Sequence, residues 1–81
     1  MGTDLSRLRW RARRGMRELD AVLLPFVERH LDGLSEEDKA RFDALLNLSD
    51  PELYDYLLRR NEPEDRGLAE LINRIRGSVG D

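Results

Sequence analysis

The chain has 81 residues, the length of one small domain, and carries a net charge of −3 at pH 7. It contains no cysteine and one histidine, His30, which excludes disulfides, cysteine-ligated zinc and multi-histidine metal sites. Apolar residues make up 40% of the chain and charged residues 38%, and no apolar run is long enough to span a membrane.

Apolar residues recur at helical spacing, and no stretch alternates with the period of a strand. The first predicted helix begins after an N-cap at Thr3 or Asp4 and ends at Gly15, since glycine readily adopts the left-handed conformation that closes a helix. A second helix is predicted from residue 16 to about residue 30. Its apolar periodicity continues on both sides of Pro25, so we expect the proline to kink this helix without ending it.

Three further helices are predicted from their start signals. Ser35 is an N-cap for the third, and Asp38 supplies a weaker form of the capping box. Ser49 caps the fourth, with Pro51 at its first turn. The fifth follows Pro63, and residues 77–81 are predicted as a frayed tail. The predicted apolar faces comprise Leu5, Leu8, Ala12, Met16, Leu19, Val22, Leu23, Leu24, Phe26, Val27, Phe42, Leu45, Leu46, Leu53, Tyr56, Leu57, Leu68, Leu71, Ile72 and Ile75.

Five helices with short connections predict an all-α fold, a compact antiparallel five-helix bundle. We expect residues 1–81 to form a single helical domain, with about residues 4–76 ordered. The N-terminus is charged and no apolar segment follows it, which argues against a signal peptide and favours a cytoplasmic protein.

Residue types that carry catalysis are scarce. His30 falls at the end of the predicted second helix, where an imidazole interacts favourably with the helix dipole. The spacing of the carboxylates does not single out a pair for acid–base catalysis, and residues 36–38 are interpreted as a solvated first helical turn. The glycines are scattered and form no phosphate-binding loop. The sequence therefore predicts no catalytic residue, no metal site and no stably bound cofactor.

Charge is unevenly distributed along the chain. Residues 1–20 carry six arginines and three acidic residues, a net charge of +3, whereas residues 21–81 carry eight basic and fourteen acidic residues, a net charge of −6. An arginine-rich helix with Trp10 could follow phosphates and stack on bases, but the anionic remainder would repel a nucleic acid. Its apolar face is too thin for membrane-surface binding. Nucleic acid and membrane are therefore not expected as partners.

The most informative stretch runs from Trp10 to Asp20. One interpretation is structural: Gly15 is a joint, and Glu18 caps the second helix or pairs with Arg14. That interpretation leaves the surplus of arginine and Trp10 unexplained. The other is that bare backbone, guanidinium forks and an indole form a surface that inserts into a partner's cleft. The partner-binding candidates are Arg13, Arg14, Gly15, Met16, Glu18 and Asp20.

The same stretch resembles a known family. Residues 14–18 match the R-G-x-x-E motif of the small succinate dehydrogenase assembly factors, called SdhE in bacteria and assembly factor 2 in mitochondria. The segments 24–26, 34–38 and 49–53 are similar to segments of that family at similar spacing, so the likeness covers about residues 5–75. Two departures are Tyr56, where many members have tryptophan, and a short C-terminal tail.

The resemblance implies a five-helix bundle that binds the flavoprotein subunit of succinate dehydrogenase, and in some bacteria that of fumarate reductase. It implies a chaperone that promotes covalent attachment of FAD to the partner and is not itself an enzyme. By position, Arg14, Gly15 and Glu18 would be the interface residues, in a bacterial cytoplasmic protein that is monomeric when free. The competing class is a generic helical adaptor with a different target.

Overall fold

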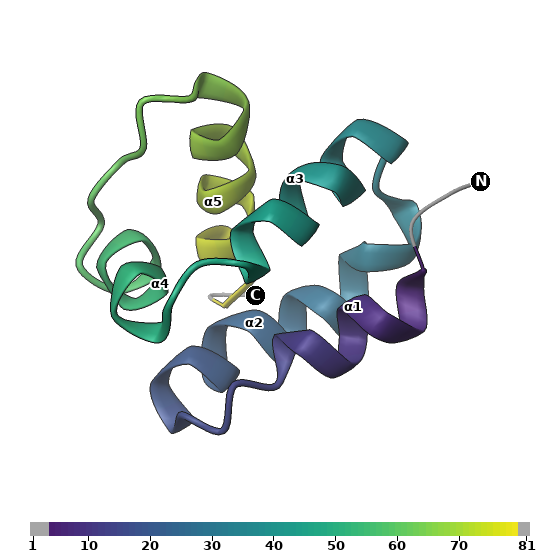
Figure 1. The fold of residues 1–81 in the computed structure, drawn as a ribbon, viewed down its shortest axis with the longest axis horizontal. Coiled ribbons are helices and arrows are strands. Elements are labelled where there is room, and N and C mark those ends of the chain that lie inside the picture. The colour runs from purple at the N-terminus through teal and green to yellow at the C-terminus, as the bar shows by residue number, and fades with distance from the viewer. Residues whose placement is uncertain (1–3, 80–81) are drawn as a thin grey trace.

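The computed structural model describes residues 4–79, which are all-α as predicted (Figure 1). In chain order the elements are α1 (Leu5–Ala12), α2 (Arg17–His30), a short 3₁₀ helix η1 (Leu31–Gly33), α3 (Glu36–Leu46), α4 (Asp50–Leu57) and α5 (Arg66–Val79). Helices α1 and α2 form an antiparallel hairpin, as Figure 1 shows. Helix α2 packs against α1, α4 and α5, while α3 contacts α1 and α5. The central helix of the bundle is therefore α2.

Side-chain caps define the starts of three helices. Asp4, Ser35 and Ser49 each accept a hydrogen bond from a backbone N–H two or three residues later, at 3.0, 3.1 and 3.4 Å. These bonds satisfy amides that have no partner inside the helix, so all three predicted N-caps are confirmed. The predicted role of Asp38 is wrong. Its carboxylate does not complete a capping box but accepts hydrogen bonds from Arg41 and Arg74.

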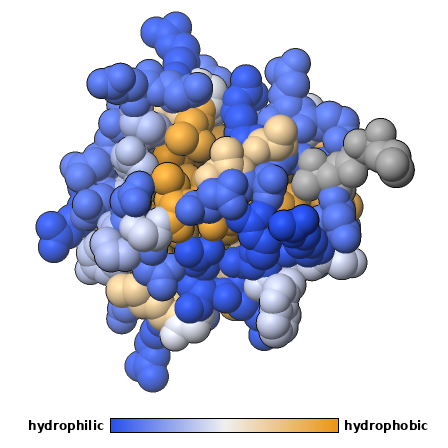
Figure 2. Space-filling view, viewed as in Figure 1, coloured by the Kyte–Doolittle hydropathy of each residue, from blue (hydrophilic) through white to orange (hydrophobic). Residues whose placement is uncertain are grey.

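The buried apolar side chains form one core to which all five α-helices contribute. Phe26 of α2 and Phe42 of α3 are fully buried, with ring centroids 5.7 Å apart. The predicted faces match this core, although Leu5, Met16, Leu24, Tyr56 and Leu68 are only partly buried at its edge. Leu31 and Leu34 are buried as well, outside the predicted faces. Figure 2 shows hydrophilic side chains surrounding a hydrophobic area in the middle of one face.

Two helix ends differ from the prediction. Helix α1 ends at Ala12 and not at Gly15, because the Arg13 backbone is already extended. Helix α5 continues through Gly77 to Val79, past the predicted start of the tail. The Arg76 guanidinium donates to the Tyr56 carbonyl, with Nε 3.1 Å away, and this bond holds the last turns of α5 against α4. Gly80 and Asp81, the rest of the predicted tail, lie outside the described residues.

Helix α2 runs through Pro25 without a break, as the periodicity predicted. The predicted kink stays a prediction. None of the helices in the described part of the chain is both long enough and apolar enough to cross a membrane.

The Ser49 cap provides a first test of the fold. Its hydroxyl accepts from the Glu52 amide and donates to the Glu52 carboxylate at 3.0 Å. Ser49→Ala is expected to lower the free energy of unfolding in urea by about 1 kcal/mol, because both bonds at the start of α4 are lost. Ser6→Ala is the matched control, since Ser6 is exposed within α1 and its hydroxyl makes no hydrogen bond with residues 4–79. Equal stability of the two variants would contradict the capping role.

Candidate functional site

The candidate site is the corner between α1 and α2, residues 13–18. Gly15 has φ +79°, a left-handed conformation that residues with side chains rarely adopt, and a Cβ built on it meets no atom of the described residues within 4 Å. Met16 precedes α2 with extended backbone and no side-chain cap. The corner therefore presents bare backbone to solvent at Gly15.

Arg14 points into the protein and not outward to a partner. Its side chain is 17% exposed, and Nε donates to Asp50 Oδ1 at 2.8 Å. Nη1 and Nη2 donate to the carbonyls of Leu46 and Leu48, each at 3.0 Å. The Leu46 carbonyl is at the end of α3, where helical carbonyls lack partners within the helix, and the Leu48 carbonyl lies two residues beyond. Arg14 thus ties the corner to the segment between α3 and α4. The assignment of Arg14 as a partner-binding residue stays a prediction.

Asp20, and not Glu18, provides the polar contact inside the corner. The Asp20 carboxylate accepts from the Arg14 backbone N–H at 2.9 Å, and Asp20 is only half exposed. Glu18 neither caps α2 nor pairs with Arg14, so both structural interpretations of Glu18 are wrong. Asp20 has the larger role in holding the loop, and Glu18 is left on the surface.

Four exposed side chains surround Gly15. The side chains of Arg13, Arg17 and Glu18 make no hydrogen bond or ion pair with the rest of residues 4–79. Trp10 is 76% exposed and is the only large apolar side chain so exposed in the described part of the chain. Unpaired charges of both signs beside an exposed indole have the composition of a protein interface, in which tryptophan and arginine are enriched.

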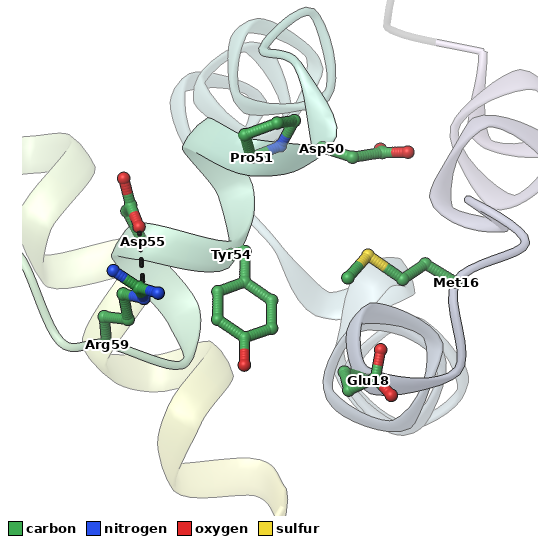
Figure 3. A pocket seen from close by; sticks show the side chains of 7 residues that line it. All are labelled: Met16, Glu18, Asp50, Pro51, Tyr54, Asp55 and Arg59. Atoms are coloured by element: carbon green, nitrogen blue, oxygen red, sulfur yellow. Dashed lines mark ion pairs between the residues drawn. The ribbon is translucent and has the colours of Figure 1, made fainter.

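Two open pockets flank the corner. The α1–α2 pocket has a volume of about 600 Å³ and is lined by Trp10, Arg11, Arg13, Arg14, Gly15, Asp20 and Leu24. The α2–α4 pocket has a volume of about 560 Å³ and is lined by Met16, Glu18, Asp50, Pro51, Tyr54, Asp55 and Arg59 (Figure 3). The partner-binding candidates are therefore divided between two hollows, with Arg13, Arg14, Gly15 and Asp20 in the first and Met16 and Glu18 in the second. Trp10, which the sequence had singled out, lines the α1–α2 pocket, and Tyr54 and Arg17 are added to the candidate set.

The surplus of arginine in the first segment has a structural explanation. Arg9 pairs with Asp32 of η1, Arg11 pairs with Asp43 of α3, and Arg14 pairs with Asp50 of α4. Of the six arginines in residues 4–20, only Arg7, Arg13 and Arg17 have no ion-pair partner in the described part of the chain. This pairing reduces the positive charge that a nucleic acid would meet.

The other candidate groups for chemistry do not converge. The His30 imidazole packs against the buried Phe26, with ring centroids 5.5 Å apart. No group of three or more metal-ligating side chains is placed to hold a metal ion in the part of the chain that the structure describes. The geometry of the corner fits contact with another protein better than a reaction at the protein's own side chains.

Comparison with known proteins identifies the family. Residues 6–79 match the family described as Sdh5, flavinator of succinate dehydrogenase. The chain belongs to this family. This confirms the resemblance that the R-G-x-x-E motif indicated.

Relatives within the family cover most of both chains. The chain is 45% identical over 73 residues to the "FAD assembly factor SdhE" of Pseudomonas aeruginosa, which covers 90% of this chain and 87% of the relative. It is 48% identical over 69 residues to the protein of the same name from Idiomarina loihiensis, covering 85% and 77%. The Serratia protein of that name is 45% identical over 69 residues, covering 85% and 78%.

Proposed function

We propose that this protein is an assembly factor that binds the flavoprotein subunit of succinate dehydrogenase and promotes covalent attachment of FAD to that subunit. Family membership supports this proposal, since the family is described as the flavinator of succinate dehydrogenase and relatives are named FAD assembly factors. The observation that carries it is the exposed corner, where Gly15 has no side chain and the charged groups of Arg13, Arg17 and Glu18 have no partner among residues 4–79.

The proposed mechanism is conformational. A protein that binds one conformer of its partner more tightly than another raises the population of that conformer, by an amount set by the difference in affinity. The factor would hold the flavoprotein in the arrangement in which FAD becomes attached. No bond is formed or broken on its own side chains, and FAD is the substrate of the partner's reaction. On this mechanism the protein is a chaperone and not an enzyme.

The side chains of the corner have distinct roles in this proposal. Gly15 lets the partner approach the backbone closely, Arg13 and Arg17 meet acidic groups, and Glu18 meets a basic group. Arg14 and Asp20 act as positioning residues, because their hydrogen bonds fix the loop from inside. Met16 lines the α2–α4 pocket next to Glu18.

In-gel flavin fluorescence of the dehydrogenase flavoprotein subunit, with and without this protein, tests the proposal. We expect a higher covalent flavin yield when the protein is present. Glu18→Ala should lower both this yield and the affinity for the subunit, since Glu18 is exposed and its side chain makes no hydrogen bond or ion pair within residues 4–79. If Glu18→Ala leaves both the covalent flavin yield and the affinity unchanged, the corner is not the surface that binds the flavoprotein.

The salt dependence of binding separates this function from nucleic-acid binding. Loss of affinity for a nucleic acid is steep between low and moderate salt, because each phosphate contact releases counterions. A protein interface with few unpaired charges should show a shallower dependence.

A further inference from the structure

We propose that the α2–α4 pocket receives a lysine or arginine side chain of the partner flavoprotein. The inference rests on the proposed function for the identity of the partner, and on the pocket itself for the chemistry of the group that enters it. It also assigns Tyr54, on a helix far from the corner in sequence, to the docking surface.

The charge of the pocket favours a cation. Three carboxylates and one guanidinium line it. Asp50 is already bonded to Arg14 at 2.8 Å, and Asp55 pairs with Arg59 at 3.6 Å, the ion pair drawn in Figure 3. Glu18 alone among these carboxylates has no partner in the described part of the chain. Glu18 lies in the first turn of α2, where the helix dipole stabilises a negative charge even without an ion pair. The pocket thus keeps one negative charge available.

The apolar part of the pocket fits the stem of a long side chain. Met16 and Tyr54 face each other across the hollow, with Glu18 at its edge (Figure 3). Lysine and arginine bury their methylene stems on apolar surface while their charged ends remain paired or hydrated. The Tyr54 ring already has a guanidinium over it, because the Arg59 Cζ atom lies 5.7 Å from the ring centroid. Tyrosine at this site is therefore compatible with a nearby cation.

The alternatives fit the pocket less well. An acidic side chain would enter among three carboxylates and be repelled. An apolar side chain would remove water from Glu18 without supplying a hydrogen bond, and an unpaired buried charge is costly. Among these three classes, a cationic side chain alone pairs with the carboxylate and also packs against the apolar walls.

The pocket is continuous with the corner. Met16 and Glu18 belong to both, and Gly15 lies directly before them. A partner that contacts the bare backbone at Gly15 therefore reaches the α2–α4 pocket without any rearrangement of this protein.

The affinity of purified variants for the flavoprotein subunit tests the proposal. Glu18→Gln keeps the shape of the side chain and removes its charge, and it should weaken binding at least about tenfold, the usual loss for a charge-assisted hydrogen bond. Tyr54→Ala should weaken binding by a similar factor, with its unfolding midpoint measured to show that the bundle is intact. Glu70→Gln is the matched control, because Glu70 is exposed on α5 and away from the pocket, and it should bind as wild type.

A charge-reversal pair identifies the group. Glu18→Lys should reduce affinity more than Glu18→Gln, and one lysine or arginine of the flavoprotein, replaced by glutamate, should restore it. If Glu18→Gln and Glu18→Lys both bind the flavoprotein as tightly as wild type does, the cation assignment is wrong while the proposed function stands. If Arg59→Ala weakens binding and Glu18→Gln does not, the pocket takes an anion and the proposal is overturned. If wild type itself does not bind the flavoprotein, the proposed function and the named partner both fail.

Discussion

Gly15→Arg is expected to abolish promotion of covalent FAD attachment while leaving the bundle folded. A residue with a side chain pays about 1–2 kcal/mol for the left-handed backbone at position 15, but no atom of residues 4–79 obstructs the new Cβ. The arginine must therefore project outward, into the space where the partner approaches. We expect affinity for the flavoprotein subunit to fall by about 100-fold or more, the loss typical of a hot-spot position. Covalent flavin yield should fall to the level seen without the factor.

Gly33→Arg is the matched control for this variant. Gly33 is also exposed, and a Cβ there also meets nothing within 4 Å, but it lies in η1, beyond the C-terminal end of α2 and away from the corner. Gly33→Arg should therefore leave both affinity and flavin yield unchanged. Gly15→Asn adds a second comparison, since asparagine adopts the left-handed conformation with less strain. An active Gly15→Arg variant would show that no partner approaches the corner closely.

The starts of the helices could be predicted from the sequence because the signals are local. Asp4, Ser35 and Ser49 each bond to an amide two or three residues away, so a short stretch of sequence contains both partners. The ends of α1 and α5 depend on more distant features. The last turns of α5 are held by the bond from Arg76 to the carbonyl of Tyr56, twenty residues earlier in the chain. Periodicity carries no information about such a contact.

The position of the candidate site could be predicted, but not the direction of its side chains. The left-handed Gly15 follows from its place between two helical patterns. Arg14 and Arg13 are neighbours of the same type, and no local signal distinguishes them. The partner that draws Arg14 inward, Asp50, is 36 residues away and becomes adjacent only when α4 packs beside α2. Tyr54 joins the site through the same packing. The sequence around Tyr54 predicts that it lies in the fourth helix, but not that it lies beside the corner.

Arg14→Ala is expected to destabilise the fold, in contrast to its neighbour. The change removes the ion pair with Asp50 and the bonds to the Leu46 and Leu48 carbonyls, which one mostly buried guanidinium supplies. Hydrogen bonds to a charged group contribute about 1.5–3 kcal/mol, so we expect the free energy of unfolding to fall by about 2 kcal/mol. For a chain of this size the Tm should drop by about 8–15 °C. Thermal unfolding followed by circular dichroism measures this.

Arg13→Ala, beside Arg14→Ala, separates a role in binding the partner from a role in stabilising the fold. Arg13 is exposed and its side chain has no partner in residues 4–79, so its removal should change stability by less than about 0.5 kcal/mol. It should still weaken binding to the flavoprotein, because its charge faces outward. Arg14→Lys should recover only part of the lost stability, since an ammonium group cannot reach the carboxylate and both carbonyls in the manner of a planar fork. If Arg13→Ala and Arg14→Ala lower the Tm equally, Arg14 does not hold the corner. A stability loss confined to Arg14 would instead mean that the first residue of the motif acts on the partner indirectly, by fixing the loop on which Gly15 and Glu18 are presented.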